Sequence, residues 1–220
     1  MNKTPGTPDC SFDPIADMDE NVQVEPVFPT PIFWYVLRGA DGLNTTLRDL
    51  ILERERATQS IAKSNQGGWQ SAPDLLQWGG PAIATLERYL NTVVRVATLR
   101  LLGPADQGVE FDMYAWAAVN RKGHYNTIHV HPMSTWSGVY YVDIGLEPGE
   151  SPDAQLEFQH PVTAALMTFF PGRLHSARLV QPENGMIILF PSYLQHSVRM
   201  HDGEAPRVCV SFNAHERSGG

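Results

Sequence analysis

Apolar residues recur at helical spacing in two segments of the first half of the chain. The first segment predicts a helix that Asn44 or Thr45 caps, because their short polar side chains can accept hydrogen bonds from free backbone amides. A second helix is predicted from Pro81, a residue favoured in the first helical turn, to about Gly103. The apolar stripe of the first helix consists of Leu43, Leu47, Leu50, Ile51 and Ile61. The two helices together predict a helical cover from about residue 43 to residue 103.

After Gly103 the pattern changes to short segments that are rich in β-branched and aromatic residues. Gly, Pro, Asn or Asp bounds each segment, which is typical of β-strands. The predicted strands are 109–120, 126–131, 137–145, 154–158, 185–190 and 206–214, with an edge strand at 27–37. Two helices followed by strands without βαβ alternation predict a mainly β, antiparallel sandwich or barrel with the helices packed outside it.

The acidic charge of the chain is concentrated at its start. Among residues 1–25, one lysine and six acidic side chains give a charge of −5, out of −8 for all 220 residues. This polar stretch lacks apolar periodicity, so it cannot bury enough surface to offset the entropy lost on ordering. We therefore expect a flexible acidic leader at residues 1–27 and a single domain at residues 28–220.

Composition also limits the partners and the location of the protein. The net negative charge argues against a nucleic acid partner, because such proteins bind phosphates through clustered Lys and Arg. The longest apolar runs are about five residues, far shorter than the ~18 needed to cross a bilayer, so no membrane partner is expected. The start lacks a secretory signal pattern, and Cys10 and Cys209 are too few for a disulfide framework, which indicates a cytoplasmic protein. The edge strand at 27–37 would allow a homodimer.

Three of the eight histidines stand out by their spacing. His129 and His131 are two residues apart in predicted strand 126–131, so both side chains leave the same face. His196 follows an apolar strand that ends at Pro191, and a short turn would direct it back toward the sheet. Three neutral imidazoles suit Fe, Zn, Ni or Cu better than Ca or Mg. An isolated His-x-His pair is more often structural, and the other five histidines lack a spaced partner.

The last predicted strand carries an arginine on the face that points into the barrel. Alternation along 206–214 places Arg207 and Ser211 on the same face. Burying an unpaired charge is costly, so an inward guanidinium requires an anion. The open alternative is that Arg207, at the start of the strand, reaches solvent or pairs with Asp202 or Glu204.

The motifs around these residues resemble two related groups of proteins. GHYNTIHVH (123–131) followed by GMIILFPSYLQH (185–196) resembles the paired motifs of cupin-type double-stranded β-helices. A closer resemblance is to bacterial 2-oxoglutarate- and Fe(II)-dependent oxygenases of the same fold, and it covers most of the chain from about residue 28. It rests on SNQGGWQS (64–71), HVHPMSTWSGVYYV (129–142), LFPSYLQHSV (189–198) and PRVCVSFNA (206–214).

The resemblance implies a double-stranded β-helix, a cupin-like jelly roll, that holds one Fe(II) ion in the mouth of the barrel. The implied metal ligands are His129, His131 and His196. His131 stands where this superfamily usually has Asp or Glu, which raises the charge of the site by one. Asp143 and Glu157 are candidates for a replacement carboxylate, but neither has the spacing of a ligand partner.

The resemblance also implies the cosubstrate and the reaction. Arg207 would bind the far carboxylate of 2-oxoglutarate, with Tyr141 and Ser211 beside it. Trp136, close to the histidines in sequence, is expected to line the substrate pocket. The enzyme would be an oxidoreductase, a dioxygenase that hydroxylates a small-molecule or peptide substrate while 2-oxoglutarate is converted to succinate and CO2.

Two alternatives stay open at this point. One is a cupin-type metalloenzyme with three histidines that does not use 2-oxoglutarate. The other is a non-catalytic, cupin-like ligand-binding module whose metal is structural or absent.

Overall fold

The computed structural model describes residues 29–103, 108–146, 154–162, 164 and 177–217. The predicted leader at residues 1–27 lies outside the described residues. Contacts along the chain group Pro31–Gly220 into one compact unit, and the description below concerns this unit. None of the described helices has the length and the apolar character that a membrane span requires.

The two predicted helices are present. Helix α2 spans Asp41–Ala57 and α3 spans Pro81–Leu102, with a short 3-10 helix η1 at Leu75–Gln77 between them. The prediction that Asn44 or Thr45 caps the first helix is wrong, because the helix begins three residues earlier. Asn44 is instead buried within α2, where its side-chain oxygen accepts a hydrogen bond from the hydroxyl of Tyr140.

The strands form two antiparallel sheets. The first has the order β1-β9-β6-β11-β4-β3 and the second the order β2-β5-β10-β7-β8. The strands of the first sheet are β1 (Phe33–Val36), β9 (Met186–Pro191), β6 (Trp136–Asp143), β11 (Arg207–Glu216), β4 (Phe111–Asn120) and β3 (Trp69–Gln70). Those of the second are β2 (Asn65–Gln66), β5 (Tyr125–His129), β10 (His196–Val198), β7 (Leu156–Gln159) and β8 (Ala177–Val180).

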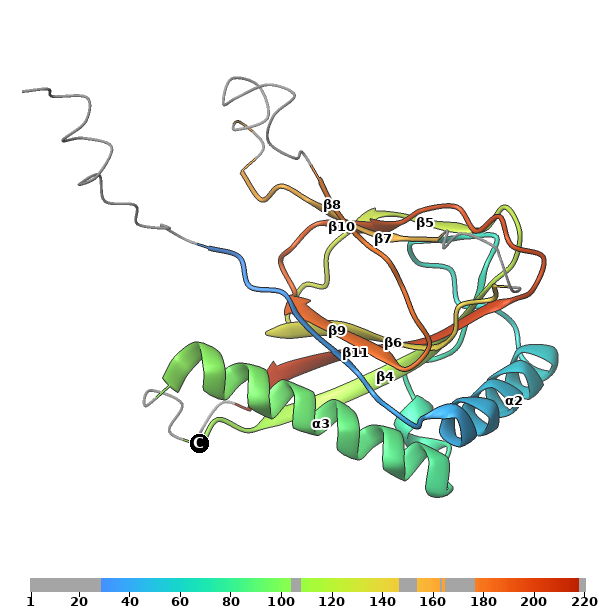
Figure 1. The fold of residues 1–220 in the computed structure, drawn as a ribbon, viewed down its shortest axis with the longest axis horizontal. Helices are drawn as coiled ribbons and strands as arrows, with labels where there is room; N and C mark the ends of the chain where they lie inside the picture. The colour runs from blue at the N-terminus through green and yellow to red at the C-terminus, as the bar shows by residue number, and fades with distance from the viewer. Residues whose placement is uncertain (1–28, 104–107, 147–153, 163, 165–176, 218–220) are drawn as a thin grey trace, which may run out of the picture. The chain divides into compact units, whose positions relative to one another are not determined.

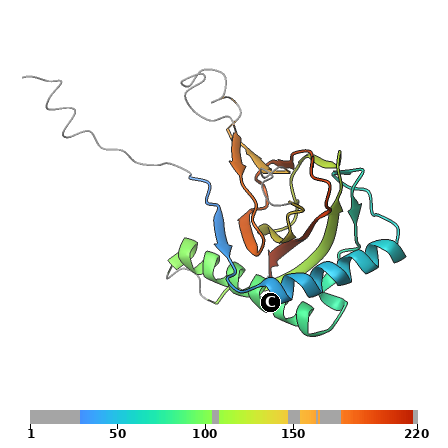
Figure 2. The same ribbon diagram turned by 45° about the vertical axis from the view of Figure 1, so that its right-hand side comes forward.

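From β4 onward the chain winds between the two sheets. Strands β4, β6, β9 and β11 belong to the six-stranded sheet, and β5, β7, β8 and β10 belong to the five-stranded sheet that faces it (Figures 1 and 2). The chain therefore changes sheet after every strand except at the β7–β8 pair. This winding is that of a double-stranded β-helix, as the sequence predicts.

Some predicted strand boundaries are wrong. The edge strand predicted at 27–37 is limited to β1, and β5 ends at His129 rather than at His131. Pro132 explains the second difference, because it lacks a backbone donor and disfavours continuation of the ladder. The short strands β2, β3, β8 and β10 were not predicted, because two to four residues are too few to show a period.

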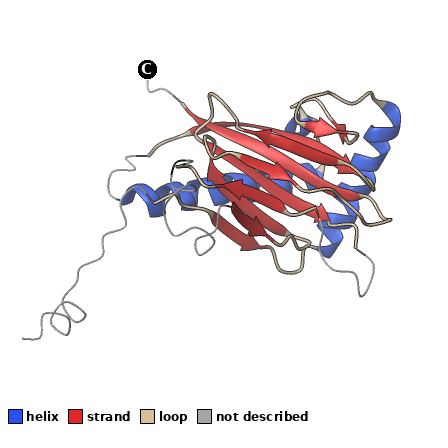
Figure 3. Cartoon of the chain, turned by 90° about the horizontal axis from the view of Figure 1, so that it is seen from above, coloured by secondary structure: helices blue, strands red, loops and turns tan. Residues whose placement is uncertain are grey.

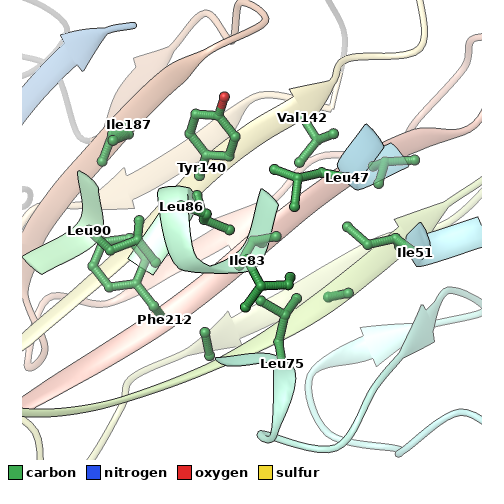
Figure 4. Packing of buried hydrophobic residues seen from close by; sticks show 14 of the residues in the cluster. Leu47, Ile51, Leu75, Ile83, Leu86, Leu90, Tyr140, Val142, Ile187 and Phe212 are labelled. Carbon is green, nitrogen blue, oxygen red and sulfur yellow. The ribbon is translucent and has the colours of Figure 1, made fainter. Parts of the chain in front are cut away.

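The helices cover the outer face of the six-stranded sheet (Figures 1 and 3). Leu47 and Ile51 of α2 and Leu86 of α3 pack with Tyr140 and Phe212 of the sheet in one buried cluster (Figure 4). Each fully buried large apolar side chain contributes about 1.5–3 kcal/mol. Because side chains alternate along a strand, anchoring one face of the sheet to the helices directs the other face into the barrel.

Candidate active site

A cavity of about 800 Å³ lies inside the barrel. Both sheets line it, and residues of the chain between positions 61 and 73 complete its wall. The last strand shows how the alternation divides the two faces. Val208, Val210 and Phe212 belong to the cluster under the helices, whereas Arg207 and Ser211 line the cavity, as predicted from the sequence.

The three predicted histidines converge in this cavity. Each offers one nitrogen, and these nitrogens all lie within 4.8 Å of one another. His129, the last residue of β5, lies directly opposite His196, the first residue of β10, in the antiparallel ladder. The turn after β5 brings in His131, whose backbone amide donates to the carbonyl of Ser192 at 3.0 Å. The expectation that strand alternation alone aligns His129 and His131 is therefore wrong, and the turn supplies the second ring.

Backbone carbonyls orient two of the rings. Nδ1 of His129 lies 2.7 Å from the carbonyl oxygen of Thr127, and Nδ1 of His196 lies 2.8 Å from that of Leu194. A carbonyl only accepts hydrogen bonds, so both Nδ1 atoms carry the proton. The lone pairs of His129 and His196 are consequently on Nε2, the atom that faces the centre of the group, as in many metal sites.

The third ring is held by a side-chain network. Nδ1 of His131 lies 3.3 Å from the amide nitrogen of Asn213, which also donates to the hydroxyl of Tyr114 at 2.8 Å. The Ser137 hydroxyl donates to the side-chain oxygen of Asn213 at 2.7 Å. Asn213 and Ser137 are both buried, so this network is fixed within the barrel wall.

Burial keeps the imidazoles neutral. It lowers the pKa of His131 to about 4, with a smaller effect of the neighbouring His129, and it lowers the pKa of His196 to about 3. The pKa of His129 is also lowered by burial, and its hydrogen bond to Thr127 opposes this. Metal ions bind a deprotonated nitrogen, so the three imidazoles need not lose a charge-carrying proton before a metal binds at neutral pH.

The donor set fits a borderline divalent metal such as Fe(II). Nε2 of His131 and Nε2 of His196 are 3.2 Å apart, a separation that suits two ligands on one ion with metal–nitrogen bonds of ~2.1 Å. Among the described residues no carboxylate joins the group. Asp143 pairs with Arg48 and Glu157 with Arg199, so both candidate carboxylates are engaged elsewhere. A bound divalent ion would therefore keep its full charge of about +2.

Arg207 and Tyr141 form a polar pair at another part of the cavity wall. Arg207 is only 3% exposed, and its guanidinium carbon lies 5.2 Å from the centre of the Tyr141 ring. Nε of Arg207 and the hydroxyl of Tyr141 are buried and have no hydrogen-bond partner among the described residues. Burial raises the pKa of Tyr141 to about 12 although the guanidinium opposes it, so the phenol keeps its proton and can donate. Two buried donors without acceptors fit a carboxylate ligand.

The alternative placements of Arg207 do not hold. Its burial excludes a side chain that reaches solvent, and Glu204 forms its ion pair with Lys122. In the part of the chain that the structure describes, no carboxylate pairs with Arg207, and one of its terminal nitrogens lies 3.5 Å from the sulfur of Cys209.

The prediction that Trp136 lines the pocket is wrong. Its side chain lies on the opposite face of β6, in the cluster under the helices, where Nε1 donates to the hydroxyl of Thr98 at 3.0 Å. The alternation of β6 could have shown this, since Trp136 shares its face with Tyr140 and not with Tyr141.

Sequence reasoning missed the aromatic residues of β4 that do line the cavity. Trp116 packs against His131 with ring centres 5.7 Å apart, and Tyr114 stacks beside it. In the ladder Trp116 lies opposite Ser211 and Tyr114 opposite Asn213. Pairing β4 with the last strand would have identified them, but the register of two strands nearly a hundred residues apart cannot be taken from either strand alone.

Comparisons with known proteins agree with the fold. A prolyl-4-hydroxylase from Pseudomonas putida is 17% identical with a TM-score of 0.59, and the match covers 86% of this chain and 94% of that one. A prolyl hydroxylase from Trichoplax adhaerens is 13% identical with a TM-score of 0.59, covering 84% and 83%. HygX from Streptomyces hygroscopicus, with nickel and 2-oxoglutarate bound, is 14% identical with a TM-score of 0.55, covering 84% and 83%. Among curated proteins no match was found.

The fold and the cavity thus define a double-stranded β-helix protein with a three-histidine site, and the predicted fold class is confirmed. Residues 114–213 match the model of a protein family described as "Putative 2OG-Fe(II) oxygenase". This segment includes the three histidines, Tyr141 and Arg207. This match indicates a 2-oxoglutarate- and Fe(II)-dependent oxygenase, an oxidoreductase, and the resemblance seen in the sequence is confirmed.

Proposed function

We propose that this protein hydroxylates a small-molecule or peptide substrate at an iron site formed by His129, His131 and His196. The observation that carries the proposal is a pair of buried donor atoms without a hydrogen-bond partner among the described residues, Arg207 Nε and the Tyr141 hydroxyl, in the same cavity as the three histidines. One cavity thus provides ligands for a metal and donors for a carboxylate, which is the combination that 2-oxoglutarate and Fe(II) require.

The residues of the chain would divide the work as follows. His129, His131 and His196 would hold Fe(II), and their lowered pKa values keep them neutral for this role. Arg207 and Tyr141 would donate to the far carboxylate of 2-oxoglutarate. Ser211, on the same face of β11 as Arg207, would donate to the cosubstrate between them.

When bound, Fe(II) and 2-oxoglutarate supply the oxidising chemistry, in which O2, 2-oxoglutarate and a substrate C–H bond give succinate, CO2 and the hydroxylated product. The residues of the chain position the cosubstrate and the substrate and keep water away from them. The buried walls around Arg207 exclude water from the cosubstrate, which strengthens each charged hydrogen bond. Trp116 packs against His131 and limits the directions from which a substrate can approach.

The structural neighbours support both substrate types. The Trichoplax enzyme is in complex with a peptide fragment of hypoxia inducible factor, and one HygX structure contains hygromycin B. The cytoplasmic location and the homodimer through the edge strand stay predictions from the sequence.

The test is a titration of the anaerobic Fe(II) protein with 2-oxoglutarate. We expect a weak visible charge-transfer band, which reports a 2-oxo acid chelated to iron, and succinate release once O2 is admitted. Replacement of Arg207 by Gln should weaken 2-oxoglutarate binding by roughly tenfold to a hundredfold, because a charged hydrogen bond is lost. Arg199→Gln is the matched control, since Arg199 pairs with Glu157 and does not line the cavity.

The absence of the band in a protein with stoichiometric Fe(II) would contradict the proposal. It would favour the cupin-type metalloenzyme that does not use 2-oxoglutarate. A protein that binds no metal at all would favour the non-catalytic module.

A further inference from the structure

The segment between the two helices closes one side of the barrel. Strand β2 pairs with β5 at the edge of the five-stranded sheet, and β3 pairs with β4 at the edge of the six-stranded sheet. Residues 60–71, which we name the β2–β3 segment, therefore connect the two sheets. Figure 2 shows this segment, in cyan, along one side of the barrel.

Hydrogen bonds hold the β2–β3 segment in place. The backbone amide of Thr127 donates to the carbonyl of Ser64 at 3.0 Å, and that of Ile61 donates to Gln70 at 2.9 Å. Within the turn, the amide nitrogen of Asn65 donates to the carbonyl of Gly68 at 2.7 Å. The segment is thus an ordered wall of the cavity, and its inward side chains have defined positions.

Most of these inward side chains are polar, and Ile61 is the apolar one. Lys63, Ser64 and Gln70 all line the cavity, and the Ser64 hydroxyl lies 3.4 Å from Nε2 of His129. Lys63 immediately precedes Ser64 and lines the same cavity as the three histidines. Lys63 is exposed to solvent, and no described carboxylate forms an ion pair with it.

The described lining of the cavity has charges of one sign only. Lys63 and Arg207 are its cations, and no Asp or Glu of the described residues is among its lining. The three neutral histidines leave the charge of a bound divalent ion uncompensated. After 2-oxoglutarate has contributed two negative charges, the cavity keeps an excess of positive charge, which favours an anion and disfavours a cation.

We propose that the substrate of this enzyme is an organic anion whose carboxylate pairs with Lys63 of the β2–β3 segment. This inference rests on the proposed function and adds the substrate class to it. Arg207 is reserved for the cosubstrate at the buried part of the wall, whereas Lys63 lies at the solvent-exposed part, where a substrate enters. Ser64 and Gln70 line the same cavity and carry groups that can donate to a carboxylate.

The experiment uses the Zn(II)-loaded full chain saturated with 2-oxoglutarate, and ligand-observed NMR. The probes are three matched sets: N-acetyl amino acids with a free carboxylate, the corresponding N-acetyl amino acid amides, and amino acid amides with a free amine. We expect members of the acidic set to bind and their neutral and cationic counterparts not to bind. Lys63→Gln should weaken the binding of those acids by roughly tenfold to a hundredfold without changing the Kd of 2-oxoglutarate.

Lys122→Gln is the control for the loss of a lysine charge. Lys122 is exposed and pairs with Glu204 outside the cavity lining, so this variant should bind the acids as the parent protein does. Equal binding of acids and amides, no binding of any acid at millimolar concentration, or acid binding that Lys63→Gln leaves unchanged would overturn the inference. These outcomes differ from failure of the proposed function, in which the parent protein would not bind 2-oxoglutarate.

Discussion

The side-chain amide of Asn213 lies 3.3 Å from Nδ1 of His131, although the two residues are 82 positions apart. The amide nitrogen faces the ring, so Nδ1 accepts and the proton of His131 lies on Nε2, toward His196. His131 needs a free lone pair on Nε2 to bind a metal there. A rotation of the Asn213 amide by half a turn would place its oxygen opposite Nδ1, move the proton to Nδ1 and free Nε2.

We therefore predict that Asn213 controls metal affinity through the tautomer of His131. Asn213→Leu removes both hydrogen-bonding orientations and should weaken Co(II) binding by about 10-fold to 100-fold. Asn213→Asp should retain Co(II) binding, because a carboxylate accepts from His131 Nδ1, Ser137 and Tyr114 together. Competition titrations with a chelator measure both affinities.

Asn91→Leu is the control for the loss of an amide, since Asn91 lies on the exposed face of α3 and its amide nitrogen donates to the carbonyl of Glu87 in the same helix. If Asn213→Asp loses as much Co(II) affinity as Asn213→Leu, the amide acts through packing and the tautomer explanation is wrong.

The lowered histidine pKa values predict how stability depends on pH in the metal-free protein. His131 and His196 titrate near pH 4 and pH 3 when folded but near 6.5 when unfolded. Between these values only the unfolded chain binds the protons, so the free energy of unfolding falls as pH decreases below 6.5. Each group contributes a slope of about 1.4 kcal/mol per pH unit. Urea denaturation at several pH values between about 5 and 7 measures this slope.

A double variant, His131→Gln with His196→Gln, is the reference for that measurement. It lacks both groups, so its slope in this pH range should be smaller than that of the parent protein. Carboxylates titrate below this range and contribute little to the difference. Identical slopes would contradict the lowered pKa values.

Trp136 and Trp116 lie on opposite faces of the six-stranded sheet, so their replacement should affect stability and ligand binding separately. Trp136→Leu leaves a gap in the cluster under the helices and should lower the free energy of unfolding by about 2–4 kcal/mol, with little effect on metal or 2-oxoglutarate binding. Trp116→Leu should weaken metal or 2-oxoglutarate binding with little effect on the free energy of unfolding, because Trp116 lines the cavity and packs against His131. Chemical denaturation together with binding titrations of both variants distinguishes the two. A Trp136→Leu variant of normal stability with weakened cosubstrate binding would return Trp136 to the pocket.

The sequence predicted those parts of the site that depend on local periodicity. Alternation along the last strand was enough to predict that Arg207 and Ser211 point inward, because the two-residue period of a strand can be read without knowing its neighbours. The motifs around His129 and His196 also predicted part of the site. Their resemblance to a known family indicated that the two histidines share one metal site, which periodicity alone does not show. Trp136 is close to the histidines in sequence, but the alternation of its own strand places it on the other face of the sheet.

The parts that could not be predicted depend on long-range register. The hydrogen bonds of Asn213 require β11, β6 and β4 to be aligned to the residue, and the position of Trp116 requires the same alignment. The β2–β3 segment contains two strands of two residues each. Their partners β5 and β4 determine that they are strands, and their own composition does not. Gly67 and Gly68 lie in a polar stretch whose sequence does not indicate that it closes one side of a barrel.

That closure makes a prediction about Gly67. Its φ of +82° is unfavourable for other residues, and a Cβ there would lie 2.5 Å from the ring of His124. Gly79 has a φ of +77° but open space around the Cβ position, so Gly79→Ala has the same backbone cost without the clash. Gly67→Ala should therefore lower the free energy of unfolding by about 1–3 kcal/mol more than Gly79→Ala.

The clash should also loosen the wall locally. Hydrogen exchange at the amide of Thr127, which donates to Ser64, should accelerate in Gly67→Ala and not in Gly79→Ala. Binding of an acidic probe should weaken in Gly67→Ala alone, because Lys63 loses its fixed position when the β2–β3 segment separates from β5. Equal effects of the two alanines would show that only the backbone conformation matters, and that contact with the barrel does not position this segment.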